Sequence, residues 1–228
     1  MAREPVRGPG LIVLDFDGTL ADTALDLTET MNVILTRHGR ERVPHEQVRE
    51  MVGGGARKIM ERGFAHTGEP ASEALLDQLF HEFLDYYGDH LADHTQVFDG
   101  LVPVLETLEQ RGARLGVVTN KVEGLSHEVL GLLDLKRFFP VLIGGDTLPV
   151  KKPDPAPLFE AIDRLGGNRA KAVMVGDSPF DIDAAKNAGI PSIAVSFGYT
   201  HVPPAEMGAT HLIDHYDEFL AAFDALDF

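Results

Sequence analysis

Two carboxylates stand one residue apart at the end of an apolar run, in the segment LIVLDFDGTL at 11–20. If this run forms a β-strand, Asp15 and Asp17 project from the same side of it. Carboxylates held so close repel each other, and a bound cation relieves that repulsion. The pair is therefore a candidate for metal binding or for catalysis by carboxylate groups.

Three further polar clusters follow apolar runs in the same way. They are Thr119-Asn120-Lys121, Lys151-Lys152-Pro153, and Gly176-Asp177-Ser178 with Asp181 nearby. In open parallel sheets, ligands bind at the carboxyl ends of the strands. A lone Asp-x-Asp occurs often in surface turns, but four polar clusters at one sheet edge are improbable by chance. We therefore expect the four clusters to converge on one site.

The residue types in these clusters suit a phosphoryl group. Clustered carboxylates offer the hard oxygen ligands of Mg²⁺, which keeps some waters and often takes a phosphate oxygen as a further ligand. Lys152 would add a positive charge, and Thr119 and Asn120 would donate hydrogen bonds to oxygen. With no cysteine and no Ser-His-Asp arrangement, the candidate nucleophile is a carboxylate, which can form an aspartyl-phosphate.

Buried strands and amphipathic helices alternate along most of the chain, as the positioning of such a site requires. Short apolar runs typical of parallel strands occupy 11–15, 113–119, 141–145, 171–177, 192–195 and 210–213. Helical patterns occupy 100–111, 155–165, 180–188 and, at the end of the chain, 216–228. This alternation predicts an α/β fold with a doubly wound, parallel, Rossmann-like sheet.

The region from 23 to 90 has a different pattern. Helical segments are expected at 24–38, 44–51, 55–66 and 72–90, separated by glycines and Pro70. The insertion is too long for a simple crossover, so we expect an all-helical cap domain inserted after the first strand. The predicted organisation is a catalytic core from 1–22 and 91–228, with the cap at 23–90.

The overall composition excludes several classes of protein. The 228 residues carry 20 Lys and Arg against 36 Asp and Glu, a net charge of −16, which argues against nucleic acid or an anionic membrane as a partner. The absence of cysteine excludes disulfides and thiolate chemistry. With no signal-like or membrane-length apolar segment, we expect a cytoplasmic protein, monomeric or homodimeric, whose partner is a small phosphorylated metabolite.

The polar clusters also resemble a known family. The segments DFDGTLAD, VVTN, KKPDPAP and VGDSPFDI, in this order across 15–182, are similar to the four motifs of the haloacid dehalogenase superfamily. The resemblance implies that Asp15 is the nucleophile and that Asp17 protonates the leaving group and then activates water. It also implies that Asp15, the backbone carbonyl of Asp17, and Asp177 ligate Mg²⁺.

The same resemblance assigns supporting roles to the other clusters. Thr119 and Asn120 would bind the transferring phosphoryl oxygens. Lys152 matches the motif better than Lys151, because it directly precedes Pro153. Asp181 and Ser178 would lie behind the metal ligands, with Asp181 orienting a metal-bound water or Lys152.

A closer resemblance suggests the substrate. GGGARKIMERGF at 53–64, LIGGD at 142–146, KKPDPAPL at 151–158 and VSFGYT at 195–200 resemble the phosphoglycolate phosphatase subgroup. This implies hydrolysis of 2-phosphoglycolate to glycolate and phosphate. Alternatives are a phosphatase for another small ester or for pyrophosphate, and a sugar-phosphate mutase, which keeps both aspartates. A non-catalytic binding module is disfavoured, because the set of Asp15, Asp17, Lys152 and Asp177 is intact.

The loop GGGARK at 53–58 is the expected specificity element of the cap. Its glycines would allow the backbone, including Gly54, to approach the site closely. Arg57 or Lys58 would meet a substrate carboxylate. The alternative is that the glycines only break a helix and that Arg57 is solvated.

Overall fold

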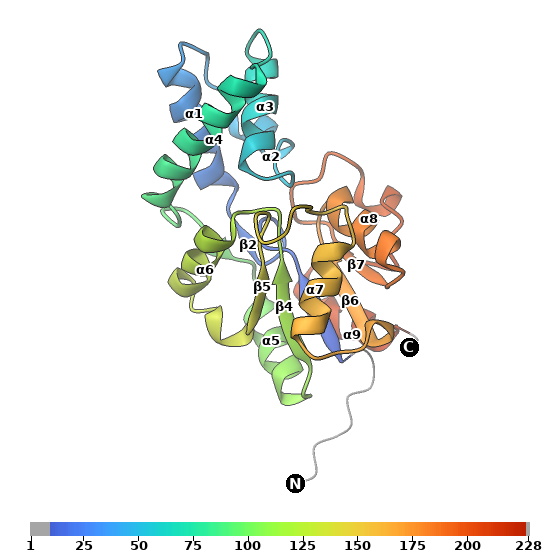
Figure 1. Ribbon diagram of the computed structural model, residues 1–228. Helices are drawn as coiled ribbons and strands as arrows, with labels where there is room; N and C mark the ends of the chain where they lie inside the picture. The colour runs from blue at the N-terminus through green and yellow to red at the C-terminus, as the bar shows by residue number, and fades with distance from the viewer. Residues whose placement is uncertain (1–9, 227–228) are drawn as a thin grey trace.

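The computed structural model describes residues 10–226 and is built on one parallel sheet of six strands (Figure 1). The order β5-β4-β1-β6-β7-β8 places the first strand in the centre, as a doubly wound α/β fold requires. The strands are β1 (Leu11–Leu14), β4 (Arg114–Val118), β5 (Val141–Ile143), β6 (Ala172–Gly176), β7 (Ser192–Val195) and β8 (His211–Ile213). The fold class predicted from the alternating pattern is confirmed.

Both faces of the sheet are covered, which explains why its strands read as continuous apolar runs. Ile12 and Leu14 point to one face, and Leu11 and Val13 to the other, because side chains alternate along a strand. The first face packs against α5 (Leu101–Gln110), α6 (Glu123–Leu132) and α9 (Phe219–Asp224). The second face packs against α7 (Ala156–Arg164) and α8 (Pro179–Ala188).

Four helices form a separate layer above the carboxyl ends of the strands (Figure 1). They are α1 (Ala24–Arg37), α2 (His45–Arg49), α3 (Ala56–His66) and α4 (Glu73–Gly88). The N-terminus of α4 is capped by Ser72, whose hydroxyl oxygen accepts a hydrogen bond from the Leu75 amide. The predicted all-helical insertion after the first strand is therefore present, with helix ends within two residues of those expected.

The two chain crossings between this layer and the sheet lie side by side. Strand β2 (Ala21–Asp22) pairs antiparallel with β3 (Gln96–Val97), which the sequence pattern did not predict because each strand is only two residues long. The carboxylate of Asp26 in α1 accepts hydrogen bonds from the amides of His94 (3.0 Å) and Thr95 (2.9 Å). The outgoing and returning segments are thus tied to each other.

The end of the chain forms less helix than the pattern at 216–228 predicts. A 3₁₀ turn at Tyr216–Glu218 leads into α9, and the last two residues lie outside those described. Phe219 and Phe223 of this helix are buried against the sheet. Further 3₁₀ turns are Lys136–Phe138, Arg169–Lys171 and Pro204–Glu206.

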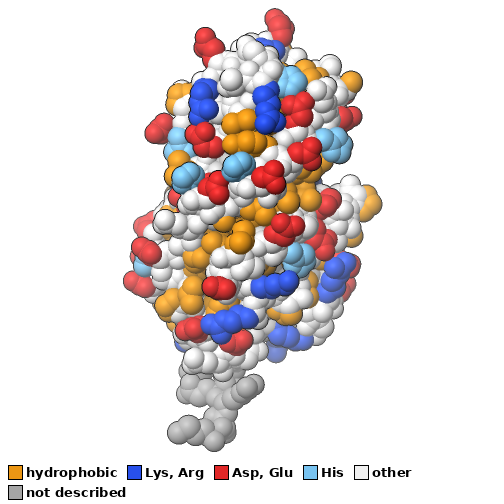
Figure 2. Space-filling view, turned by 90° about the vertical axis from the view of Figure 1, so that its left-hand side faces the viewer, with side chains coloured by type: hydrophobic (Ala, Val, Ile, Leu, Met, Phe, Trp, Pro, Cys, Tyr) orange, Lys and Arg blue, Asp and Glu red, His pale blue; other side chains and the backbone are white. Residues whose placement is uncertain are grey.

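Apolar side chains gather at the waist between the helical layer and the sheet, on the face seen in Figure 2. No helix within residues 10–226 is both long and apolar enough to cross a membrane.

Candidate active site

The four polar clusters meet beside the central strand, three of them directly after a strand and the fourth through Lys152. Asp15 directly follows β1, Thr119 follows β4 and Asp177 follows β6. Strand β1 lies between β4 and β6, and the chain winds in opposite directions on its two sides. Such a reversal opens a crevice at the carboxyl ends of the strands, where ligands of these folds bind.

The carboxylates of Asp15, Asp177 and Asp181 form a buried cluster. One oxygen of each lies within 4.8 Å of the others, and the three residues are 4%, 2% and 0% exposed. Burial and the charge of Asp181 raise the pKa of Asp15 to about 7. Burial and the charges of Asp181 and Asp15 likewise hold the pKa of Asp177 well above its ordinary value. Hard oxygen donors under this mutual repulsion fit a divalent cation.

Lys152 is the cation already present in the cluster. Its Nζ lies 2.8 Å from Asp15 Oδ1 and 2.6 Å from Asp181 Oδ1, and it donates to the carbonyl of Val118 at 2.7 Å. Burial alone would lower the pKa of Lys152, but the two carboxylates outweigh it and raise the pKa. The neighbouring Lys151 donates instead to the carbonyl of Gly54 at 2.7 Å. The structure thus places Lys152, rather than Lys151, at the carboxylates.

Asp181 is held by the first turn of α8. The hydroxyl and amide of Ser178 donate to Asp181 Oδ2 at 2.6 and 3.0 Å, forming a capping box. Its other oxygen faces Lys152. Asp181 thus contacts Lys152, as one of its two predicted roles requires, and one of its oxygens lies among the clustered carboxylates, while Ser178 supports it from behind.

Asp177 is fixed by two donors from loops. Thr19 Oγ1 donates to Oδ1 at 3.2 Å, and the Tyr199 amide donates to Oδ2 at 2.8 Å. A Cβ at Gly198 would come within 2.2 Å of the Asp177 Cβ. The loop after β7 can therefore approach this carboxylate only because residue 198 is glycine.

The side chain of Asp17 points away from this cluster and toward the helical layer. Its Oδ1 accepts hydrogen bonds from Thr23 Oγ1 at 2.7 Å and from Lys121 Nζ at 3.0 Å. This separation suits two carboxylates with different tasks. Metal ligation through the Asp17 carbonyl stays a prediction.

Lys121 is the functional candidate that the sequence reasoning missed. Its Nζ also donates to the hydroxyl of Tyr87 in α4 at 2.7 Å and lies 4.3 Å from the centre of the Tyr87 ring. Burial lowers the pKa of Lys121, but Asp17 and Tyr87 outweigh it and raise the pKa. Its position directly after Asn120 was a usable signal. Nothing in the sequence marks Tyr87, because the contact requires α4 to lie over the sheet.

A pocket lies between Asp15, Asp17 and the helical layer, and its empty space, with the adjoining open solvent counted, is about 450 Å³. Its polar wall contains Asp15, Asp17, Thr119, Asn120 and Lys121. Its apolar wall comes mainly from the helical layer and contains Leu27, Val52, Ile59, Phe83 and Leu84. A small ligand with an anionic end would match this division.

The loop Gly53–Gly55, called here the glycine loop, closes one side of the pocket. Asn120 Nδ2 donates to the Gly53 carbonyl at 3.0 Å, and a Cβ at Gly55 would come within 2.7 Å of the Asn120 carbonyl oxygen. Gly53 and Gly55 line the pocket, whereas the carbonyl of Gly54 is taken by Lys151. Asn120 Oδ1 is buried without a hydrogen-bond partner among the described residues, so an acceptor faces this region.

Arg57 is placed outside this arrangement. Its guanidinium donates to Glu73 at 2.7 Å and to Asp77 at 3.1 Å, both strongly exposed carboxylates. The neighbouring Lys58 pairs with Glu61 at 2.7 Å. Both cations predicted to meet a substrate carboxylate are thus engaged with acidic residues of their own helical layer.

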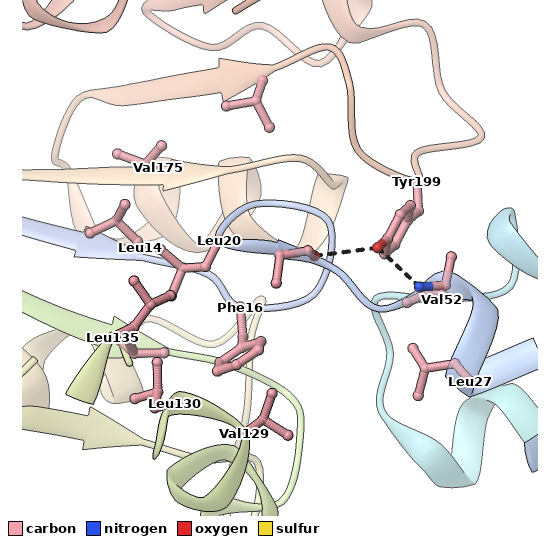
Figure 3. Packing of buried hydrophobic residues seen from close by; sticks show 14 of the residues in the cluster. Leu14, Phe16, Leu20, Leu27, Val52, Val129, Leu130, Leu135, Val175 and Tyr199 are labelled. Atoms are coloured by element: carbon pink, nitrogen blue, oxygen red, sulfur yellow. Dashed lines mark hydrogen bonds between the residues drawn. The ribbon is translucent and has the colours of Figure 1, made fainter. Parts of the chain in front are cut away.

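Tyr199 joins the carboxylate cluster to the start of the helical layer. Figure 3 shows its ring pointing toward the start of that layer. Its amide holds Asp177, while its hydroxyl accepts from the amides of Thr23 at 2.6 Å and Ala24 at 3.2 Å. The same hydroxyl lies 2.7 Å from Asp22 Oδ1, to which it donates. Arg49 of α2 stacks 4.9 Å above the ring centre.

Known proteins are similar to this chain in sequence and in fold. The profile of the haloacid dehalogenase-like hydrolase family matches residues 12–195. A phosphoglycolate phosphatase of Caulobacter vibrioides is 42% identical over 205 residues, covering 90% of this chain and 86% of the relative.

Solved structures agree with that match. A predicted phosphoglycolate phosphatase from Haemophilus somnus superposes with a TM-score of 0.87 at 28% identity, covering 93% of this chain and 96% of that one. CbbY from Rhodobacter sphaeroides in complex with phosphate gives 0.78 at 26% identity, covering 95% and 99%. The motifs, the sheet order and these matches together place the chain in the haloacid dehalogenase-like hydrolase family.

Proposed function

We propose that this protein is a Mg²⁺-dependent phosphatase that hydrolyses 2-phosphoglycolate to glycolate and phosphate. The observation that carries the proposal is the buried set of Asp15, Asp177, Asp181 and Lys152, which reaches through Asp15 into a pocket whose other wall is apolar. The relatives named phosphoglycolate phosphatase, at 37–42% identity over most of the chain, support the choice of substrate.

Asp15 and Asp17 would divide the chemistry. An oxygen of Asp15 attacks phosphorus, the bond from phosphorus to the ester oxygen breaks, and Asp17 gives its proton to the departing alkoxide. Asp17 then takes a proton from water, which attacks phosphorus and releases phosphate and free Asp15. Their separate surroundings support this division, since Asp15 lies against Lys152 and Asp17 against Lys121.

Asp15, Asp177 and the backbone carbonyl of Asp17 would hold Mg²⁺, which would supply positive charge against the approach of an anionic phosphate to an anionic nucleophile. Lys152 would add to that charge and keep Asp15 in place. Thr119 would donate a hydrogen bond to the phosphoryl oxygens, because it lines the pocket beside Asp15. The side-chain amide of Asn120 already donates to the carbonyls of Gly53 and Lys152, so it would have to leave one of them to donate to a phosphoryl oxygen.

We also propose that residues 23–90 act as a cap over a core formed by 1–22 and 91–228. The apolar pocket wall and the contacts of the glycine loop with Asn120 and Lys151 support a role of this layer in excluding water.

Phosphate release from a panel of 2-phosphoglycolate, sugar phosphates, nucleotides and pyrophosphate tests the proposal. We expect the highest kcat/KM with 2-phosphoglycolate, loss of activity with EDTA, and recovery with Mg²⁺. Interconversion of sugar phosphates without phosphate release would favour a mutase instead. Turnover of no compound in the presence of Mg²⁺ would favour a binding module.

A further inference from the structure

We propose that Lys121 binds the carboxylate of the substrate and so determines which phosphate esters the enzyme prefers. The inference rests on the proposed function, since it concerns how the same site tells 2-phosphoglycolate from esters without a carboxylate. It differs from the expectation drawn from the sequence, which assigned this task to Arg57 or Lys58.

The first argument is the supply of positive charge. Of the residues that the structure describes, Lys121 is the one Lys or Arg that lines the pocket. An ammonium group has three N–H donors. Those of Lys152 are directed at Asp15, Asp181 and the Val118 carbonyl. Lys121 has two acceptors, Asp17 and Tyr87, which leaves one donor for a ligand.

The second argument is position. A general acid must lie within hydrogen-bond reach of the ester oxygen that it protonates. In 2-phosphoglycolate the carboxylate is separated from that oxygen by a single methylene. Lys121 Nζ lies 3.0 Å from Asp17 Oδ1, the proposed acid. A cation beside the acid is therefore beside the place where the carboxylate must lie.

The third argument is the environment of the ammonium group. The side chain of Lys121 is 6% exposed, and the helical layer offers apolar groups such as Leu27, Val52 and Phe83 to the same pocket. A carboxylate enclosed there would find few other partners and little water, so its pairing with Lys121 would be screened weakly. A phosphate ester that carries several hydroxyl groups would place polar groups without partners against this apolar wall, which is unfavourable.

The fourth argument concerns the competing cations. Arg57 pairs with Glu73 and Asp77, and Lys58 pairs with Glu61. Neither Arg57 nor Lys58 is among the residues that line the pocket, so each would have to leave those partners to reach a ligand there. Lys121 needs only its remaining donor.

The test compares 2-phosphoglycolate with 2-hydroxyethyl phosphate, an analogue of equal length without the carboxylate. In the wild type we expect a clear preference for 2-phosphoglycolate. In Lys121→Met the ratio of the two kcat/KM values should fall about 10- to 100-fold, mainly through KM for 2-phosphoglycolate, because a charge-assisted hydrogen bond is lost. Any effect on Asp17 acts on both substrates and cancels in the ratio.

Further variants separate charge from folding. Lys121→Gln keeps a donor for Asp17 but removes the charge, so it should lose the preference as well, and Lys121→Arg should retain most of it. Tyr87→Phe keeps the ring and should change the ratio little. Lys171→Met, an exposed lysine outside the pocket, is the matched control and should behave as the wild type.

A binding measurement keeps the inference testable without turnover. Calorimetry on Asp15→Asn with Mg²⁺ should show tighter binding of 2-phosphoglycolate than of 2-hydroxyethyl phosphate, and the difference should vanish in the double variant with Lys121→Met. An unchanged difference there, or loss of the preference in Arg57→Met or Lys58→Met instead, would overturn the inference. A wild type that releases phosphate fastest from another ester would refute the proposed substrate, whatever the calorimetry shows.

Discussion

At the scale of single residues, the site sets two aspartates of one motif in opposite surroundings. Burial and the charge of Asp181 raise the pKa of Asp15, and Lys152 only partly offsets them. Asp17 faces Thr23 and Lys121 near the helical layer. Side chains two positions apart thus meet different partners, as a nucleophile and a proton carrier would require.

Asp15→Asn should lower the rate of phosphate release by at least ~10³-fold, because an amide oxygen is a poor nucleophile. The variant should fold normally, since Asn keeps an oxygen for the Phe16 amide and removes a charge from the cluster. Steady-state kinetics and a thermal unfolding curve check both points. Substantial turnover by a pure sample would contradict the assignment of the nucleophile.

Lys152→Met should destabilise the metal-free protein by about 3–5 kcal/mol, because Asp15 and Asp181 lose their buried partner. Urea unfolding measures the change in the free energy of unfolding. Lys151→Met is the matched control, since that lysine is exposed and contacts a backbone carbonyl, and it should cost less than about 1.5 kcal/mol. Similar costs for the two variants would argue against the charge cluster.

At the scale of elements, the loop after β7 connects parts that are far apart in the chain. Through Tyr199 it contacts Asp177 on the sheet and the first amides of α1, and Arg49 of α2 donates to the Gly198 carbonyl at 3.2 Å. A movement of the helical layer about its two crossings therefore acts on the same loop that holds a candidate metal ligand.

Tyr199→Phe should cost about 1–3 kcal/mol of stability, because the amides of Thr23 and Ala24 lose a buried acceptor. Hydrogen exchange at the start of α1 should become faster. Mg²⁺ affinity should change little, since Asp177 is held by the backbone amide of residue 199. Tyr86→Phe on α4 serves as the control. Unchanged exchange at 22–26 would contradict this role of the hydroxyl.

Much of this architecture could be predicted from the sequence because it depends on local patterns. Buried strands appear as apolar runs, and the polar residues that end them converge wherever a parallel sheet forms, so Asp15, Lys152 and Asp177 could be named in advance. The pairing of β2 with β3 could not, because two residues carry no periodicity.

The contacts between the helical layer and the rest of the chain could not be predicted from local patterns either. Lys121 stands in a recognised cluster, but its contact with Tyr87 could not be predicted, because Tyr87 lies 34 positions earlier on a helix of the insertion. Arg57 was expected to face the substrate because of its charge and its place after the glycines. The structure shows it paired with Glu73 and Asp77, which lie at the start of α4 and about one helical turn further on.

At the scale of the whole molecule, the site makes stability depend on pH and on cations. An aspartate normally ionises near 3.8, whereas Asp15 in the folded protein has a pKa of about 7. Between these values the folded state binds the extra proton, so the stability of the metal-free protein falls as pH rises from about 4 to 7. A cation binds the ionised carboxylates, so the stability that it adds to the folded protein rises with pH.

We therefore expect Mg²⁺ to raise the midpoint of thermal unfolding more at about pH 8 than at about pH 5.5, where protons compete for the carboxylates. EDTA should remove the gain at both values. Asp15→Asn lacks the carboxyl group whose pKa is raised, so the gain from Mg²⁺ should depend less on pH in this variant. Equal gains at the two pH values in the wild type would contradict the linkage.

The adjacent crossings at β2 and β3 make the helical layer separable from the rest of the chain. Ala21 pairs with Val97 and Asp22 with Gln96, so excision of the intervening segment leaves two ends that a two-residue hairpin turn can join. The sheet then keeps every strand and its order, because none of its six strands belongs to the excised part. Recombination between relatives at this junction would exchange the apolar wall of the pocket as one segment and leave Asp15, Asp17 and Lys121 in place.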